Sequence, residues 1–154
     1  MASNETKEHI KQEEKEQSPL TTDPQFSYDL LRHALLPELL GKEEEAILYW
    51  AGKSIARKEP LSSFEEIQRF FYKAQWGVIK RIKEKKHEAL FELSATSLTR
   101  EHAPVSLECG FLAEQIQLQK GFITEAAYEL KKKKPLVFEI TVRWDHKDPE
   151  RTDS

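Results

Sequence analysis

Two charged side chains are the candidates for acid–base chemistry. Glu114 stands among apolar residues in the stretch 105–120, and Arg57 closes the stretch 43–59. A carboxyl group buried in apolar surroundings has a raised pKa unless a cation pairs with it, so Glu114 and Arg57 could serve an enzyme as an acid–base pair. The structural alternative is a carboxylate at the edge of an apolar helix face, with Arg57 placed to interact with the negative C-terminal end of its own helix.

Cys109, the single cysteine, is the candidate for covalent chemistry. A helix start stabilises a thiolate, but a nucleophile also needs a base, and no histidine stands near Cys109 in a recognisable motif. We therefore expect an inert, structural thiol. The sequence has no phosphate-binding glycine loop, zinc-binding helix motif or nucleophile elbow, and one cysteine excludes a disulfide framework and a cysteine-rich zinc site. No catalytic residue, metal site or cofactor is predicted.

Composition is typical of a water-soluble globular protein. Hydrophobic residues make up 38% of the 154 residues and charged residues 33%, with a formal net charge of -3. This balance excludes a generally basic nucleic-acid binder. No apolar run approaches the ~20 residues of a transmembrane segment, and no apolar stretch near the N-terminus marks a signal peptide. We expect a cytoplasmic protein without a membrane span.

The net charge belongs to the N-terminal segment. Residues 1–24 hold six acidic and three basic side chains and almost no large apolar ones, which predicts a disordered acidic tail. Residues 25–146 are expected to form a single domain, and 147–154 a frayed C-terminus. Two basic stretches in the domain, 80–86 and 131–134, are interpreted as solvated strand ends, with docking to an anionic membrane surface as the alternative.

Hydrophobic periodicity predicts eight elements in the order ααα-ββ-α-ββ. The expected helices cover 26–36, 43–59, 64–74 and 105–120, and the expected strands cover 78–85, 88–93, 122–130 and 136–144. Pro37 should end or kink the first helix, and Ser62 or Ser63 should cap the third. Because the strands come in hairpins, the fold class is α+β, with helices packed on an antiparallel sheet of about four strands.

Gly52 falls inside the second expected helix, beside Trp50. A glycine there costs about 1 kcal/mol relative to alanine. We expect Gly52 to permit close packing against another helix. The alternative is that it leaves space for a ligand or a partner beside Trp50.

Six short segments spread over nearly the whole expected domain carry a family resemblance. They are LPELLG at 36–41, YWAGK at 49–53, ARK at 56–58, WG at 76–77, GFLAEQIQL at 110–118 and WD at 144–145. Together these segments resemble the YslB-like family of Gram-positive bacteria, which has no established activity. The element order, with a helix at 107–116 before a closing hairpin, also resembles vinyl-reductase-like small-molecule-binding domains and the α+β subunits of the TRAPP vesicle-tethering complex.

The resemblance to vinyl-reductase-like and TRAPP-subunit domains implies an apolar cavity between the helices and the sheet. The residues expected to line it are Trp50, Ile55, Phe71, Phe111 and Phe138. A fully packed core is the alternative, because protein interiors are usually close-packed. No cysteine pair flanks the final hairpin and the Tyr-x-Ser-x-Arg motif of related haem-binding sensors is absent, so the resemblance implies neither a metal nor haem here.

TRAPP subunits pair through helices, and this resemblance implies a homodimer. Its candidate surface is the first helix, with Leu30, Leu31, Leu35 and Leu36. The leading hypothesis is a non-enzymatic cytoplasmic domain that binds a small apolar ligand or a protein partner. The alternative is an enzyme with acid–base residues in a pocket between helices and sheet.

Overall fold

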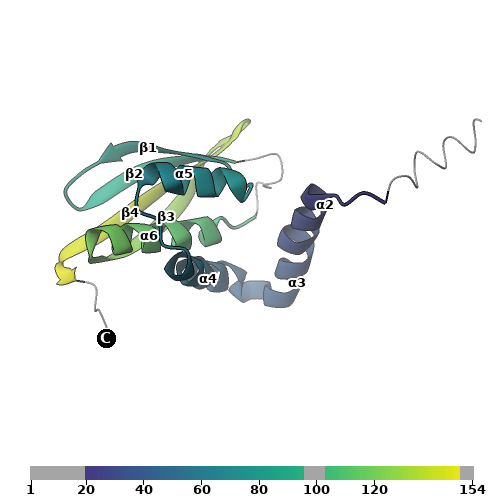
Figure 1. Ribbon diagram of the computed structural model, residues 1–154, viewed down its shortest axis with the longest axis horizontal. Coiled ribbons are helices and arrows are strands. Elements are labelled where there is room, and N and C mark those ends of the chain that lie inside the picture. The colour runs from purple at the N-terminus through teal and green to yellow at the C-terminus, as the bar shows by residue number, and fades with distance from the viewer. Residues whose placement is uncertain (1–19, 96–102, 150–154) are drawn as a thin grey trace, which may run out of the picture.

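The computed structural model describes residues 20–95 and 103–149. A four-stranded antiparallel sheet carries helices α5 and α6 on one face, helix α4 packs on α6, and a helical arm formed by α2 and α3 leads into α4 (Figure 1). The helices are α2 (Pro24–Asp29), α3 (Leu36–Leu40), α4 (Glu44–Lys58), α5 (Phe64–Lys73) and α6 (Ser106–Lys120), and the strands are β1 (Val78–Glu84), β2 (Glu88–Ser94), β3 (Phe122–Lys133) and β4 (Leu136–Pro149). The predicted α+β class and element order are confirmed.

The arm differs from its prediction at Pro37. A π-helical turn, Leu30–Leu35, follows α2, and within it the Leu36 N–H donates to the Leu31 carbonyl. Pro37 then stands in the first turn of α3, where its missing N–H is not needed. The wider turn lets the helical path pass the proline and run on to Leu40, so Pro37 does not end the helix. A 3₁₀ turn, Gly41–Glu43, joins the arm to α4.

The start of the arm lies inside the predicted tail. Asp23 accepts a hydrogen bond from the Phe26 N–H at 3.1 Å and caps α2. The ordered domain therefore begins a few residues before residue 25. The rest of the predicted tail, residues 1–19, lies outside the described residues.

The strands lie in the order β1-β2-β4-β3, so β4 is central together with β2. The predicted inward face of β4 is confirmed, because Phe138, Ile140, Val142 and Trp144 are buried. Both strands of the last hairpin are longer than predicted, and Pro149 pairs with Phe122. Residues 147–149 thus belong to β4 and are not frayed, while 150–154 lie outside the described residues.

The two turns in which the basic stretches end lie at opposite ends of the sheet. The β1–β2 turn is next to Trp144, whose N–H donates to the His87 carbonyl at 3.0 Å. The β3–β4 turn is next to the far end of β2, where the Ala95 N–H donates to the Leu136 carbonyl at 3.0 Å. The two stretches nevertheless meet at Glu92, whose pKa is lowered by a hydrogen bond from Lys131 and by the charges of Lys131, Lys132 and Lys80.

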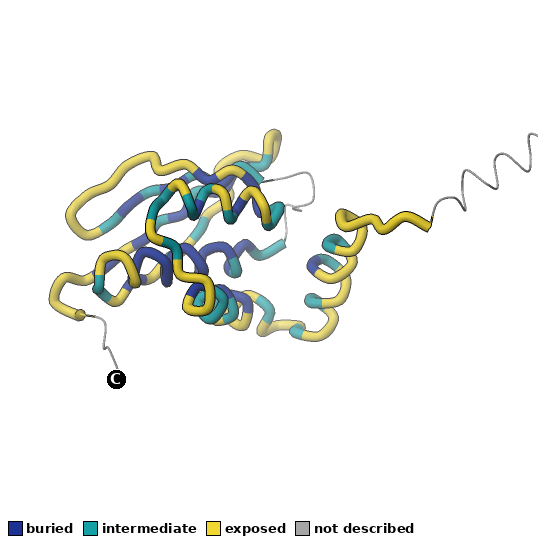
Figure 2. Tube along the Cα trace, in the orientation of Figure 1, coloured by how far each residue is buried: buried dark blue, intermediate teal, exposed yellow. Residues whose placement is uncertain are grey.

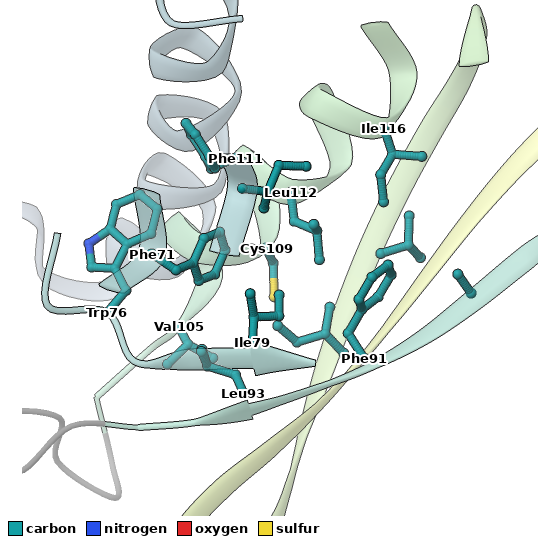
Figure 3. Packing of buried hydrophobic residues seen from close by; sticks show 14 of the residues in the cluster. Phe71, Trp76, Ile79, Phe91, Leu93, Val105, Cys109, Phe111, Leu112 and Ile116 are labelled. Atoms are coloured by element: carbon teal, nitrogen blue, oxygen red, sulfur yellow. The ribbon is translucent and has the colours of Figure 1, made fainter. Parts of the chain in front are cut away.

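The core is built from large aromatic and aliphatic side chains between the helices and the sheet (Figure 3). Phe111 of α6 stacks on Phe70 with ring centroids 4.3 Å apart, and Trp76 and Phe71 meet it edge-on at 5.4 and 6.0 Å. Offset and edge-to-face contacts of this kind add to the hydrophobic gain from burial. We call these four residues the aromatic cluster: Phe70, Phe71, Trp76 and Phe111. Helix α6, which contributes Phe111, is the most deeply buried of the described helices (Figure 2).

Candidate functional site

Helices α4 and α6 touch backbone to backbone. A Cβ at Gly52 would lie 2.1 Å from the Leu107 carbonyl oxygen, and one at Gly110 would lie 1.9 Å from the Tyr49 carbonyl oxygen. Neither position can hold a side chain, so the prediction that Gly52 permits close helix packing is confirmed. The contact fixes the first turns of α4 relative to the start of α6 and to β3.

A groove of about 530 Å³ opens beside this contact, between the start of α4, the first turn of α6 and the middle of β3. Its walls are mostly apolar, and its lining residues are small or aromatic except for one lysine and one glutamate. They are Lys42, Glu45, Ala46, Tyr49, Ser106, Cys109, Ala126, Ala127 and Tyr128. We call this the α4–α6–β3 groove. Its size suits a small molecule, and its lining combines apolar walls with a few polar groups, as ligand sites usually do.

Ser106 is the unusual member of the groove. The residue is 3% exposed, and its hydroxyl has no hydrogen-bond partner within residues 20–95 and 103–149. Leaving a buried hydroxyl unpaired costs about 1–3 kcal/mol, so native proteins rarely do so without a reason. Ser106 also begins α6, whose Val105 cap supplies no side-chain hydrogen bond to the first turn. The hydroxyl of Ser106, one of the lining residues, can therefore still form a hydrogen bond.

Two tyrosines form the sides of the groove. The Tyr49 hydroxyl accepts a hydrogen bond from the Ala126 N–H of the edge strand β3 at 3.1 Å. Burial raises the pKa of the Tyr128 hydroxyl well above its usual value, and a hydrogen bond to Glu45 and the negative charge of that carboxylate raise it further. Burial likewise raises the pKa of Tyr49, although the hydrogen bond from Ala126 opposes this. Both phenols thus stay neutral at physiological pH and act as hydrogen-bonding groups.

Cys109 lies at the base of the groove and is 1% exposed. Burial raises the pKa of its thiol well above the usual value, and the charges of Glu108 and Glu45 raise it further. A protonated thiol is a poor nucleophile. The surroundings of Cys109 thus agree with the expected inert thiol, and the helix start does not activate it.

A buried ion pair holds the arm against the start of α6. The Arg32 guanidinium donates to Glu108 at 2.6 Å and to the Pro104 carbonyl at 3.1 Å, and it also donates to the Tyr28 hydroxyl at 3.3 Å. Arg32 is 7% exposed and Glu108 is 2% exposed. Burial raises the pKa of Glu108, and the neighbouring guanidinium opposes that rise. The pair fixes the position of the first turn of α6, which contains Ser106 and Cys109.

The predicted apolar pocket does not form. Phe71, Phe111 and Phe138 are at most 2% exposed and are packed in the core, Ile55 packs partly buried against it, and Trp50 is 64% exposed on α4. Trp50 therefore shares no interior space with the phenylalanines. The physical reason is side-chain volume, since large aromatic rings fill the space between helices and sheet. For Phe71, Phe111 and Phe138 the packed-core alternative is the correct one, whereas Trp50 lies on the surface.

The structure does bring Arg57 and Glu114 together. Their charged groups are 3.7 Å apart, with Glu114 3% and Arg57 51% exposed. Glu114 is thus buried and paired with Arg57, and does not lie at an exposed edge of the helix face as the structural alternative held. Neither residue lines the α4–α6–β3 groove.

Three of the four leucines of the candidate interface are exposed. Leu30 and Leu31 are 50% and 52% exposed and Leu35 is 43% exposed, whereas Leu36 is half-buried. Leu39, at 68%, extends the row along the outside of the arm. The arm thus presents apolar side chains that nothing in residues 20–95 and 103–149 covers.

Two absences hold for the part of the chain that the structure describes. No group of three or more histidine, cysteine, aspartate or glutamate side chains is arranged to bind a metal ion. No helix in that part is both long and apolar enough to cross a bilayer.

Comparison with known proteins assigns a family. Residues 25–143 match the model of a protein family of unknown function, DUF2507. The chain belongs to the DUF2507 family. The chain is also similar to the uncharacterised protein YslB of Bacillus subtilis (strain 168), with 43% identity over 129 residues, which cover 80% of this chain and 86% of YslB. The resemblance to YslB-like proteins is confirmed.

The fold of this DUF2507 protein is similar to that of a vinyl-4-reductase family protein from Methanocaldococcus jannaschii. The TM-score is 0.56 and the sequence identity 18%, and the match covers 79% of this chain and 83% of the other. At this identity the likeness concerns the fold alone. It confirms the fold-level resemblance to vinyl-reductase-like domains.

Sequence reasoning missed most of the groove. Glu45 and Tyr49 stand four residues apart and so share a helix face, and Ala126-Ala127 put two small side chains in a strand that is otherwise bulky or charged. Each signal is weak alone. The α4–α6 contact brings Glu45 and Tyr49 close to Ser106, and no sequence pattern predicts that these residues are neighbours.

Proposed function

We propose that this chain is a non-catalytic binding domain that holds a small, largely apolar molecule in the α4–α6–β3 groove. The observation that carries the proposal is Ser106, a buried residue of the apolar-walled groove whose hydroxyl has no partner among the described residues. A ligand that presents one hydrogen-bonding group to Ser106 would remove that cost and would cover the apolar walls.

The chemistry of the other polar groups supports binding over catalysis. The raised pKa values keep the Cys109 thiol and the Tyr128 hydroxyl protonated at physiological pH, so neither is an activated nucleophile or base. The charges of Glu45 and Glu108 that raise the Cys109 pKa also disfavour an anionic ligand there. We infer a neutral ligand with an apolar body and one hydroxyl or carbonyl group.

Native mass spectrometry of the protein purified from its own host tests this proposal. Wild type should carry an added mass that is lost on denaturation. Ala46→Trp places an indole in the groove from an exposed position and should remove that mass. Ile47→Trp is the matched control, since Ile47 is exposed on the same helix but does not line the groove. A ligand-free wild type, or an added mass that survives Ala46→Trp, would contradict the proposal.

A second role is favoured by the arm. We propose that a second copy of the chain covers the exposed row of Leu31, Leu35 and Leu39, which recur every fourth residue. Helix-mediated pairing is also what the resemblance to TRAPP subunits implies. Light scattering should give the mass of a dimer for wild type and of a monomer for the double variant L31E/L35E, and a monomeric wild type at high concentration would overturn this role.

A further inference from the structure

Two histidines meet at one corner of the sheet, away from the groove. His87 stands in the β1–β2 turn and His146 near the end of β4, and both are exposed. Their Nδ1 atoms are 3.1 Å apart. Neutral imidazole has one ring nitrogen that carries a proton and one with a free lone pair, so two Nδ1 atoms at this distance share either one proton or one cation.

The orientation of the rings excludes a straight hydrogen bond and fits either a bent hydrogen bond or a shared metal ion. Two Nδ1 atoms 3.1 Å apart in a straight hydrogen bond would put the ring centroids about 5.4 Å apart. The observed centroid separation is 4.8 Å, with the rings at 88° to each other. The ring axes are therefore inclined to the line that joins the two Nδ1 atoms.

The same two distances fit a shared metal ion. Two nitrogens bound to Zn²⁺ at about 2.05 Å, with an angle of roughly 100° at the metal, lie about 3.1 Å apart and place their ring centroids about 4.9 Å apart. Both separations match those of His87 and His146. The two separations are therefore those that a single ion bound by both histidines requires.

The surrounding contacts hold this geometry in place. The Trp144 N–H and its indole N–H donate to the His87 and Lys86 carbonyls, each at 3.0 Å, and so fix the turn against β4. The ring of His146 lies against Phe122, with centroids 4.5 Å apart and an angle of 33°. His87 is thus positioned through its backbone and His146 through its ring.

Charges of both signs surround this corner, because Lys86 precedes His87 in the chain and Asp145 and Lys147 flank His146. Lys120 lies over the Trp144 ring at 4.4 Å, and its ammonium group is paired with Glu84 at 3.2 Å. The C-terminal end of α6, which precedes Phe122, adds the partial negative charge of unpaired carbonyl groups.

We propose that His87 and His146 form a two-histidine site for a divalent transition-metal ion such as Zn²⁺, Ni²⁺ or Cu²⁺. Imidazole suits these ions, whereas Mg²⁺ and Ca²⁺ require oxygen ligands. Two protein ligands leave coordination positions for water or for a ligand from outside the described residues. The site is separate from the α4–α6–β3 groove, and either one can exist without the other.

Isothermal titration of the full chain with ZnCl₂, after removal of metals with a chelator, tests the site. Wild type should bind Zn²⁺, and His87→Ala and His146→Phe should each weaken the affinity at least tenfold, because loss of a direct ligand should cost no less than loss of a supporting contact. His146→Phe keeps an aromatic ring against Phe122 and so guards against simple loss of structure. His9→Ala, outside the described residues, is the matched control and should bind like wild type.

A second readout depends on the ligands themselves. With Cu²⁺ in place of Zn²⁺, electron paramagnetic resonance should show coupling to two nitrogens in wild type and to one in each single variant. Wild type that does not bind Zn²⁺ at millimolar concentration would overturn the proposal. So would unchanged affinity in both His87→Ala and His146→Phe, with their thermal unfolding confirming that they are folded.

Discussion

The aromatic cluster around Phe111 and the α4–α6–β3 groove are both built on α6, yet one is filled and the other is hollow. In the cluster, four large rings contact one another and exclude solvent. In the groove, Ala46, Ala126 and Ala127 leave space between helix and strand that neither backbone can close. In this fold, open space is found where the side chains are small, and not where aromatic residues are most abundant.

Phe111→Ala, in the aromatic cluster, should give the largest loss of stability. Removal of a fully buried phenylalanine from a cluster that cannot collapse costs about 3–5 kcal/mol in the free energy of unfolding. Urea denaturation measures this loss. Phe26→Ala, at a residue 62% exposed on the arm, is the control and should change stability by no more than about 0.5 kcal/mol. A similar loss in both variants would mean that the cluster is not the packed core described above.

Gly110→Ala should have an intermediate effect and should touch both regions. The new Cβ meets the Tyr49 backbone, which cannot rotate away, so α4 must move off α6. Overpacking of this kind costs about 1–3 kcal/mol, and the shift of Tyr49 should also weaken ligand retention in the groove. Leu118→Ala, on the same helix but 37% exposed, provides the control for stability. If Gly110→Ala were as stable as wild type, the backbone contact could not be what fixes the groove.

Ser106→Ala should have the smallest effect on stability and the most informative one. Because its hydroxyl is buried without a partner in the described part of the chain, its removal should leave the ligand-free protein unchanged or up to about 1 kcal/mol more stable. Ser63→Ala is the contrast. Its Oγ accepts the Glu66 N–H at 3.2 Å and caps α5, so its loss should cost about 1 kcal/mol.

Thermal unfolding of the ligand-free forms compares the two serine variants directly. Ser106→Ala should also retain less ligand than wild type, whereas Ser63→Ala should retain as much. Equal destabilisation by both substitutions would mean that Ser106 is paired within the protein, and the argument for a ligand at that hydroxyl would fail.

The sequence predicted the elements well because hydrophobic period and local signals determine them. The alternation of β4, the serine cap of α5 and the glycine that ends α6 are each visible within a few residues, and all are present. Pro37 shows the limit of such reasoning. A π-helical turn before it let the helix continue, and no local pattern predicts that choice.

The site was less predictable because it depends on contacts between distant segments. Gly52 indicated a helix contact, but not that Gly110 is its counterpart. Arg32 and Glu108 are separated by 76 residues, and their pairing follows only from the docking of the arm on α6. The resemblance to vinyl-reductase-like and TRAPP-subunit domains suggested a pocket at Phe71, Phe111 and Phe138, whereas the groove lies beside alanines that carry no chemical signal.

The most direct test of the central claim is a crystal structure of the protein purified from its own host. The account predicts density for a small molecule in the α4–α6–β3 groove, with one polar atom within about 3 Å of the Ser106 hydroxyl and an apolar body against Tyr49 and Tyr128. A groove that holds only water, with the Ser106 hydroxyl bonded to another group of the protein, would contradict it.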